Sequence, residues 1–421
     1  MTNIGRILLP ALLLATGITW AAEESPPTQA QLTLDDLRTF TDVFNQIRNN
    51  FVEEVDDREL LNAAIRGMLS ELDPHSSYME ADQFREMDDD FRGRYSGIGV
   101  ELSLRNGDIK VVFVIPGGAA DGAGIEVGDV ITAVNGKDLR GTDPQLAINA
   151  LRGEAGSELD VTVEHTNGEV STHTLTRDFV KVDSVFSRPV DGDYGYFQIT
   201  RFTRKSAEEL AEQIEYMQQN RSEPLKGFVL DLRGNPGGVL KPAIEIADGF
   251  LEQGLIVDMR GRAAHEVQHM AQPGSWLQDI PMVVLVDSRS ASASEVLAGA
   301  LQDHGRALIV GETTFGKGSV QSVLNLRNGS GMRLTTSRYY TPSGRSIQAE
   351  GIRPDIEIPP VQAIEAEDGQ RREADLDRHL DSETDTGSEA FESVVSPFDD
   401  YAMYQALLLL KGASALAPDR S

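Results

Sequence analysis

The sequence predicts a multidomain α+β protein in which a helical N-terminal segment and a small β-rich module precede a larger α/β core. The chain has 421 residues, which at about 150 residues per domain corresponds to two or three domains. Hydrophobic residues make up 40% of it, a globular composition that excludes a wholly disordered or fibrous chain. The spacing of apolar residues changes along the chain from helical to alternating, and then to strands that alternate with helices. These changes divide the chain into residues 1–22, 23–95, 96–183, 184–360 and 361–421.

The charge balance excludes one class of partner. The chain carries 38 Lys and Arg residues against 67 Asp and Glu residues, a net charge of −29, which repels the phosphate backbone of nucleic acids and anionic lipid surfaces. Nucleic acid is therefore not expected as a partner. The chain contains no cysteine, which excludes disulfides, thiolate zinc sites, a cysteine nucleophile and a lipoprotein anchor.

The first 22 residues are typical of a secretory signal peptide. Arg6 precedes an apolar run at 7–18, and small residues at 21–22 offer a cleavage site. An uncleaved membrane anchor is the alternative, but Pro10 interrupts a run that is already shorter than the roughly 20 residues of a membrane span. We therefore expect export to the periplasm, no stable membrane span, and a polar linker at 23–31.

Two amphipathic helices are predicted in the N-terminal region. Thr33 and Asp36 form a capping-box pattern before a helix whose apolar residues recur every three or four positions as far as Phe51. A second helix is expected from about 57 to 72, where Asp-Pro ends it. Each helix has one apolar face, and two such helices alone cannot bury both faces. This favours packing at a domain interface or in a homo-oligomer, either a dimer or a higher oligomer.

Residues 96–183 predict a β-rich module with one helix at 144–151. Alternating strands are expected at 99–104, 109–114, 129–134 and 159–163, and Asn-Gly turns separate some of them. The glycine-containing segments at 97–100, 116–120 and 128–136 resemble those of a PDZ domain. The resemblance implies that an extended peptide adds as a strand and places its C-terminal carboxylate on backbone N–H groups of the loop made by Gly97, Ile98, Gly99 and Val100. The alternative is a purely structural module with incidental glycines.

The α/β core is predicted from apolar runs that alternate with amphipathic helices. Strands are expected at 195–199, 228–232, 256–259, 282–286 and 307–310, and helices at 206–219, 240–250 and 292–303. Functional sites of such folds lie at the carboxyl ends of strands. After the core, residues 365–400 hold 13 Asp and Glu residues against 3 Arg and predict a solvated tail, followed by a helical apolar stretch at 401–410.

Two motifs in the core resemble metal and nucleotide sites without the context that these need. His265 and His269 flank Glu266 in a zinc-protease pattern, but nearby glycine and proline residues disfavour the helix that would bring the two histidines together. An exposed connection after a strand is the preferred interpretation. Residues 311–318 match a phosphate-binding loop except at Gly318, which replaces the hydroxyl that would hold magnesium. We therefore expect no metal.

Two turns between a strand and a helix are better candidates. Ser292 lies where its hydroxyl is expected at the carboxyl edge of the sheet, beside helix N–H groups that can stabilise an oxyanion. The plain alternative is that Ser292 and Glu295 only cap the helix. The second turn, residues 231–238, contains paired glycines that suit either anion binding or close packing.

Together these segments closely resemble the carboxyl-terminal processing proteases, also called tail-specific proteases. The resemblance rests on Leu-Asp-Pro-His-Ser-Ser-Tyr at 72–78, the PDZ module, and the segments at 231–238, 290–295, 300–303, 311–321, 340–344 and 351–355, in family order and spacing. It implies a serine–lysine dyad with Ser292 as nucleophile, Lys317 as general base and Gln321 as the residue that orients the lysine.

The same resemblance implies an oxyanion hole, a regulatory arginine and no cofactor. Backbone N–H of Ala293, together with that of Gly237 or Gly238, would stabilise the tetrahedral intermediate. Arg152 matches a position linked to gating by the PDZ domain. Glu295 and Asp303 lie near the nucleophile in sequence, and capping or structural pairing is the preferred role for both.

The function expected from this resemblance is that of an exported serine endopeptidase, which hydrolyses protein substrates recognised at or near their C-termini. An exported adaptor protein is a further expected partner. The principal alternative is an inactive or partner-dependent PDZ scaffold with a protease fold, and the joint presence of Ser292, Lys317 and Gln321 argues against it.

Overall fold

The computed structural model describes residues 32–105, 108–262, 266–274, 276–277, 280–359 and 400–416. The predicted signal peptide and linker, and all of the predicted acidic tail but its last residue, lie outside the described residues. The chain divides into two compact units, Met1–Gly67 and Met68–Ser421. In the described ranges, no helix is both long enough and apolar enough to cross a membrane.

The first unit contains α1 (Leu34–Asn50) and the beginning of α2 (Asp57–Ser70). The capping box predicted at Thr33 and Asp36 is confirmed, because each residue's side chain accepts a hydrogen bond from the other's backbone N–H. No residue of α1 is buried, and apolar side chains such as Leu37 and Phe40 remain exposed.

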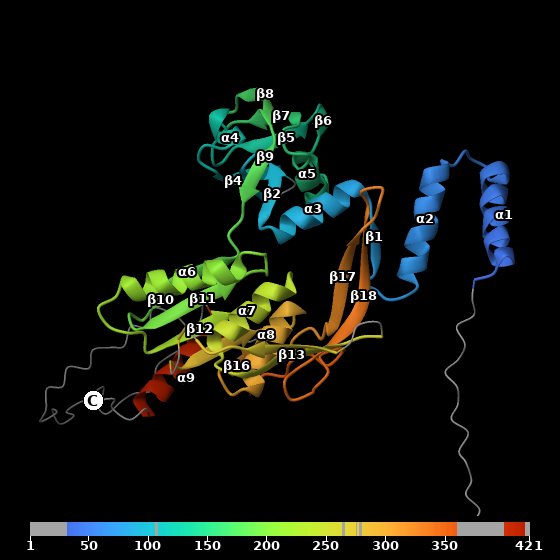
Figure 1. Ribbon diagram of the computed structural model, residues 1–421. Coiled ribbons are helices and arrows are strands. Elements are labelled where there is room, and N and C mark those ends of the chain that lie inside the picture. The colour runs from blue at the N-terminus through green and yellow to red at the C-terminus, as the bar shows by residue number, and fades with distance from the viewer. Residues whose placement is uncertain are drawn as a thin grey trace, which may run out of the picture. The chain divides into compact units, whose positions relative to one another are not determined.

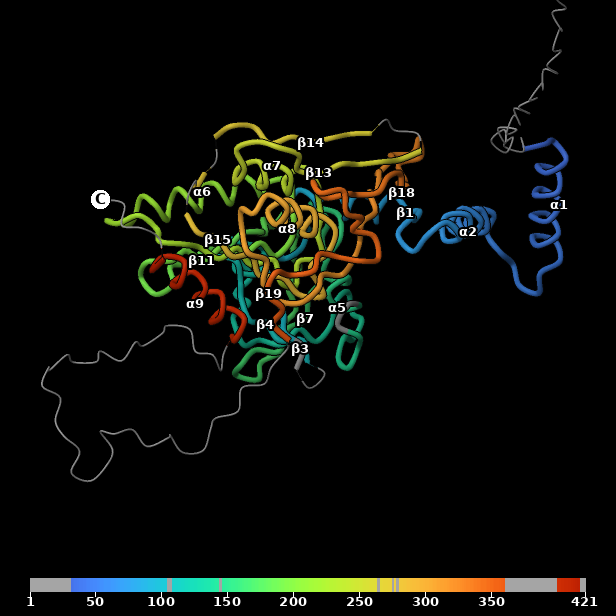
Figure 2. Tube along the Cα trace, turned by 90° about the horizontal axis from the view of Figure 1, so that it is seen from below, coloured from blue at the N-terminus to red at the C-terminus, as the bar shows by residue number. Residues whose placement is uncertain are grey.

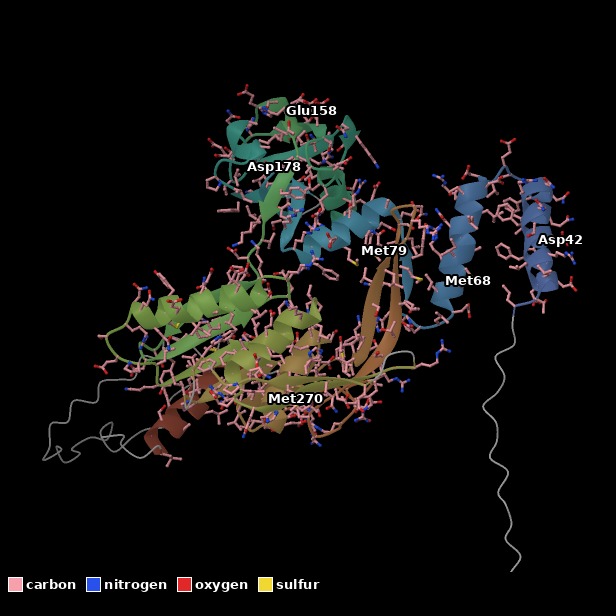
Figure 3. All side chains as sticks on the ribbon, viewed as in Figure 1. Asp42, Met68, Met79, Glu158, Asp178 and Met270 are labelled. Atoms are coloured by element: carbon pink, nitrogen blue, oxygen red, sulfur yellow. The ribbon has the colours of Figure 1, made fainter. Side chains whose placement is uncertain are left out.

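The β-rich module is a six-stranded antiparallel sheet with two short helices, α4 (Ala119–Gly122) and α5 (Pro144–Leu151). Its strands are β3 (Val100–Arg105), β4 (Asp108–Val114), β5 (Val130–Val134), β6 (Lys137–Asp138), β7 (Glu158–Glu164) and β8 (Val170–Thr176). The predicted Asn135-Gly136 turn joins β5 to β6 with positive φ at both residues, which is the conformation that an Asn-Gly hairpin requires. A two-stranded ribbon of β2 (Arg94–Gly97) and β9 (Asp178–Lys181) leads into and out of the module. Figure 3 labels Glu158 and Asp178 there.

The core is built on a sheet in the order β10-β11-β12-β15-β16-β19, antiparallel between β10 and β11 and parallel elsewhere. The strands are β10 (Val185–Val190), β11 (Tyr194–Ile199), β12 (Gly227–Asp231), β15 (Met282–Val286), β16 (Leu308–Gly311) and β19 (Ile356–Glu357). The predicted helices α6 (Ser206–Gln219) and α7 (Leu240–Phe250) are confirmed at their expected bounds, and α8 (Ala293–Asp303) begins one residue later than expected.

Side chains of this sheet alternate between its two faces, as the period of two in a strand requires. On β11, Phe197 and Ile199 pack with residues of α6, α7 and α8, whereas Tyr194 and Tyr196 face α9 (Tyr401–Leu416). Figures 1 and 2 show α9, in red, against the core sheet. Because both faces are covered, the central strands are fully buried, which explains their continuous apolar runs.

A second sheet flanks the core. The sequence predicted one of its strands, at 256–259, but wrongly assigned that strand to the core sheet, and it did not predict the sheet itself. It has the order β1-β18-β13-β14, with β17 paired to β18. Its strands are β1 (Ser77–Met79), β13 (Gly254–Arg260), β14 (Val267–Ala271), β17 (Ser319–Asn325) and β18 (Gly331–Tyr340), and helix α3 (Ala81–Phe91) follows β1. The N-terminal strand β1 thereby joins a hairpin more than 240 residues further along the chain, with Ser77 opposite Arg333.

Candidate active site

Ser292 lies at the turn between β15 and α8, as predicted, in a strained backbone conformation. Its φ is 56° and its ψ is −111°. A non-glycine residue held in such a sparsely populated region costs about 1–3 kcal/mol, and this strain is typical of nucleophile turns that lift a side chain out of the backbone. Ser292 lines a cavity of about 680 Å³ that Lys317, Gln321, Gly237 and Gly238 also line. The predicted catalytic residues therefore meet at one cavity.

Glu295 holds the nucleophile turn and the lysine loop together. Its side chain is fully buried, and Oε2 accepts hydrogen bonds from the backbone N–H of Ser292 at 2.7 Å and of Lys317 at 2.9 Å. Oε1 accepts from Thr314 Oγ1 and from the Gly316 N–H, both at 2.6 Å. The capping and structural role expected of Glu295 therefore extends to the loop of Lys317, which no local sequence signal indicated.

Lys317 lies in the loop between β16 and β17, and its side chain is half-buried. Desolvation lowers the pKa of its ammonium group, and the nearby Arg333 guanidinium lowers it further. The carboxylates of Asp73 and Glu295 act in the opposite direction but do not restore the ordinary pKa. The backbone packs tightly here, because a Cβ added at Gly318 would lie 2.3 Å from the Gln348 nitrogen. The environment therefore favours the neutral amine that a general base requires.

The geometry distinguishes between the two candidate oxyanion glycines. The Gly237 N–H already donates to Asn235 Oδ1 at 2.9 Å, and the Gly237 carbonyl accepts from the Phe202 N–H. Among the described residues, neither the Gly238 N–H nor the Ala293 N–H has a hydrogen-bond acceptor. A side chain at Gly238 is excluded, because its Cβ would lie 2.2 Å from the Phe202 carbonyl oxygen. The arrangement favours Ala293 and Gly238 as the oxyanion donors.

Gln321 lines the cavity, but its side-chain amide is engaged elsewhere. Its Nε2 donates to Ser319 Oγ at 2.9 Å and to Thr335 Oγ1 at 3.3 Å, and within the described residues no hydrogen bond joins it to Lys317. The role of Gln321 in orienting the lysine therefore stays a prediction.

The turn at 72–78, far earlier in the chain, contacts strand β18 of the β17–β18 hairpin. Asp73 accepts hydrogen bonds from Ser76 N and Oγ, and Ser76 Oγ in turn accepts from the Thr335 N–H at 3.1 Å. Arg333, which also lines the cavity, donates from Nε to the His75 carbonyl at 3.1 Å. The sequence showed this turn only as part of a family pattern, and its contact with strand β18 depends on tertiary structure.

A pocket lies at the glycine loop that is predicted to bind substrate. Gly97, Ile98, Gly99 and Val100 line a pocket of about 200 Å³ whose other walls include Ile148 and Leu151 of α5. The loop is fixed by the carbonyls of Ile98 and Gly99, which accept from the N–H groups of Ala120 and Ile115.

Arg152 lines this groove and also an adjoining cavity beside α3. Its guanidinium lies 5.5 Å from the centre of the Tyr95 ring, a cation–π distance. Arg152 is therefore at the boundary of the PDZ module, where a gating residue is expected, although its regulatory role stays a prediction.

The other residues and motifs that the sequence singled out, the histidine pair, the phosphate-loop pattern and Asp303, lie in ordinary structural surroundings. His269 lies on strand β14 rather than on a helix or in an open connection, and His265 lies outside the described residues. The part of the chain that the structure describes contains no group of three or more potential metal ligands. After Gly311 the chain continues into strand β17 and not into a helix, so the phosphate-loop pattern lacks its helix N-terminus. Asp303 accepts from the Ser343 N–H and pairs with Arg345, as its preferred structural role predicts.

Comparisons with known proteins agree with this architecture. Models of three families match the chain: peptidase family S41 at residues 193–358, the N-terminal domain of the activating protease CtpB at 17–83, and the PDZ domain at 88–164. A carboxy-terminal-processing protease of Bartonella bacilliformis is 39% identical over 420 residues, which cover 97% of this chain and 96% of the relative. The carboxy-terminal processing protease CtpA of Bacillus subtilis is 33% identical over 314 residues, which cover 74% of this chain and 67% of the relative. A solved structure of a photosystem II D1 C-terminal processing protease is 30% identical, with 76% of this chain and 86% of that chain covered and a TM-score of 0.45.

Proposed function

This chain belongs to peptidase family S41, among the carboxy-terminal processing serine proteases, and on that premise we propose that Ser292 and Lys317 form its catalytic dyad. The observation that carries the proposal is their joint placement: both side chains line one cavity, and the buried Glu295 accepts hydrogen bonds from the backbone N–H of each. The nucleophile and the base are thereby held by the same carboxylate.

The chemistry begins with a neutral lysine. Lys317 Nζ takes the proton of Ser292 as Oγ attacks the carbonyl carbon of the scissile bond. The oxyanion then lies against the N–H groups of Ala293 and Gly238, and each donor of this kind typically contributes about 3 kcal/mol of transition-state stabilisation. As the C–N bond breaks, Nζ returns the proton to the leaving amine, which leaves an acyl ester on Ser292. Water, deprotonated by the same amine, hydrolyses this ester and regenerates the hydroxyl.

We also propose that the PDZ groove binds the C-terminal end of the substrate. Its apolar walls and the glycine loop at 97–99 suit an extended chain end that adds to strand β3. The signal-peptide pattern at 1–22 supports export to the periplasm. The exposed apolar side chains of α1 support assembly into a homo-oligomer or binding of an exported adaptor.

Hydrolysis of an unfolded protein such as casein tests this proposal. The comparison includes wild type, Ser292→Ala, Lys317→Ala and, as a control, Lys241→Ala, whose side chain is exposed on α7 and pairs with Glu245 on the same helix. We expect activity in wild type and in the control, with or without EDTA, and none in the two dyad variants. Activity that is lost in EDTA and retained in Ser292→Ala would instead indicate a metalloprotease. No activity in any sample would favour the inactive or partner-dependent scaffold.

A further inference from the structure

Helix α9 packs on the face of the core sheet opposite to α6, α7 and α8 (Figures 1 and 2). Its residues Met403, Ala406, Leu407 and Leu410 are buried in one cluster with side chains of β11, β12, β15 and β16. Lys411 adds an ion pair with Asp191 at 2.5 Å. The C-terminal helix is therefore part of the folded core, although residues 360–399 separate it from the last core strand in the sequence.

Asp400, immediately before α9, forms a bidentate ion pair with Arg233. Nη1 of Arg233 donates to Oδ1 and Nη2 to Oδ2, each at 2.8 Å. Burial opposes ionisation of Asp400, but hydrogen bonds from Arg233 and from the Met403 N–H outweigh it, so the pKa of Asp400 lies below its ordinary value. Charge-assisted pairs with this fork geometry are among the stronger and more directional contacts in proteins. Asp400 is therefore a fixed anchor for the Arg233 side chain.

Arg233 belongs to the loop that carries the oxyanion glycine. Its guanidinium also bonds Asp231 at the end of β12, so it is held by one carboxylate two residues before it and by another 167 residues after it. Two residues further on, the buried Asn235 accepts from the Gly237 N–H through Oδ1 and from the Ala291 N–H through its carbonyl. Asn235, which the chain joins to Arg233 through Gly234, thus contacts both the glycine pair and the turn of Ser292.

We propose that Asp400 is a positioning residue for catalysis, which fixes Arg233 and through it the loop that presents the Gly238 N–H to the oxyanion. The inference rests on the proposed function of Ser292 and Lys317. Without Asp400, Arg233 keeps its pair with Asp231 but loses its second anchor, so the loop remains folded and varies in position. Misplacement of a donor by a fraction of an ångström reduces the stabilisation of the transition state more than that of the ground state. We therefore expect kcat to fall while KM changes little. Docking of α9 is in this way coupled to activity.

Two substitutions at Asp400 separate positioning from stability. Asn keeps an oxygen that can accept from the Met403 N–H and so preserves the helix cap, but it lacks the charge that holds Arg233. Glu keeps the charge, but its longer side chain places the carboxylate oxygen less well to accept the hydrogen bond from the Met403 N–H. Lys411→Gln is the matched control, because it removes an ion pair between α9 and Asp191. Asp191 precedes β11, whereas Arg233 follows the opposite, carboxyl end of the parallel strand β12. Peptide hydrolysis gives kcat and KM, and thermal unfolding gives the stability of each variant.

We expect Asp400→Asn to lower kcat about tenfold and to leave KM within about twofold of wild type. This loss is smaller than the roughly 10²–10³-fold loss of kcat that follows deletion of an oxyanion donor itself. Asp400→Glu should recover most of kcat even where it is the less stable variant, and Lys411→Gln should keep the wild-type kcat. Equal losses in Asp400→Asn and Lys411→Gln, or a wild-type kcat in Asp400→Asn, would overturn the inference. If Asp400→Asn does not fold, Arg233→Lys, which loses the fork, must show the same kcat loss. An inactive wild type would refute the proposed function, and this inference with it.

Discussion

Substitution of Glu295 by Gln perturbs the proposed catalytic site at a fully buried carboxylate. The carboxylate accepts four hydrogen bonds between 2.6 and 2.9 Å, two at each oxygen. Gln has one oxygen, so whichever way its amide is oriented, an NH₂ group faces two of the four donors. Hydrogen bonds to a charged group contribute about 1.5–3 kcal/mol each, so two lost bonds cost about 3–6 kcal/mol. The neutral amide is less costly to bury, and we expect a net loss of about 2–4 kcal/mol in the free energy of unfolding.

Urea denaturation monitored by circular dichroism measures this loss, and hydrolysis of casein measures activity on the same samples. Activity should fall at least about a hundredfold, because the nucleophile turn and the lysine loop no longer share one acceptor. Glu245→Gln is the control: its carboxylate is half-exposed and pairs with Lys241 on the same helix, so its effect should stay within about 0.5 kcal/mol. Wild-type stability and activity in Glu295→Gln would refute the view that this carboxylate holds the two loops together.

Two further predictions concern the pH dependence of catalysis and the C-terminal helix. In the proposed mechanism activity requires the neutral amine of Lys317, so kcat/KM should rise with pH through the lowered pKa of that lysine. Arg333→Gln removes a cation that lowers this pKa and should move the rise to higher pH, whereas Asp73→Asn removes an anion that raises it and should move the rise to lower pH. Shifts in the same direction would contradict the proposed electrostatics. Leu407→Asp places a carboxylate in the core beneath α9 and should destabilise the protein by about 3–5 kcal/mol in thermal or urea unfolding. Leu408→Asp, at a half-exposed position, should change stability by about 0.5 kcal/mol or less, and equal effects of the two would count against docking of α9.

The elements that the sequence predicted are those whose apolar pattern is local. Helices α5, α6 and α7 were predicted at their observed bounds, because one apolar stripe and flanking turn residues define each of them. The buried runs of β12 and β15 were recognisable because helices cover both faces of the sheet. The flanking sheet was not predicted, since β1 is only three residues long and pairs with a strand far along the chain. Strand β14 was expected to be an exposed connection, because its glycine and proline neighbours resemble a loop.

The candidate site divides in the same way. Ser292 and Lys317 were identified from family resemblance, and the structure adds that they line one cavity. The choice of Gly238 over Gly237 depends on which N–H is already bonded, which only the folded backbone reveals. Arg333 and Asp400 lie at ordinary positions in a strand and before a helix, and their contacts with the catalytic loops arise from tertiary packing.

Trapping of the acyl-enzyme tests the central claim most directly. Wild type, Ser292→Ala and Lys317→Ala are each mixed with a p-nitrophenyl ester of a short peptide, quenched in acid within seconds, digested and examined by mass spectrometry. An acyl group on Ser292 in wild type, strongly reduced in Lys317→Ala and missing from Ser292→Ala, is the predicted result. An acyl group on another residue in wild type, or turnover that continues in Ser292→Ala, would contradict the assignment of Ser292 as the nucleophile.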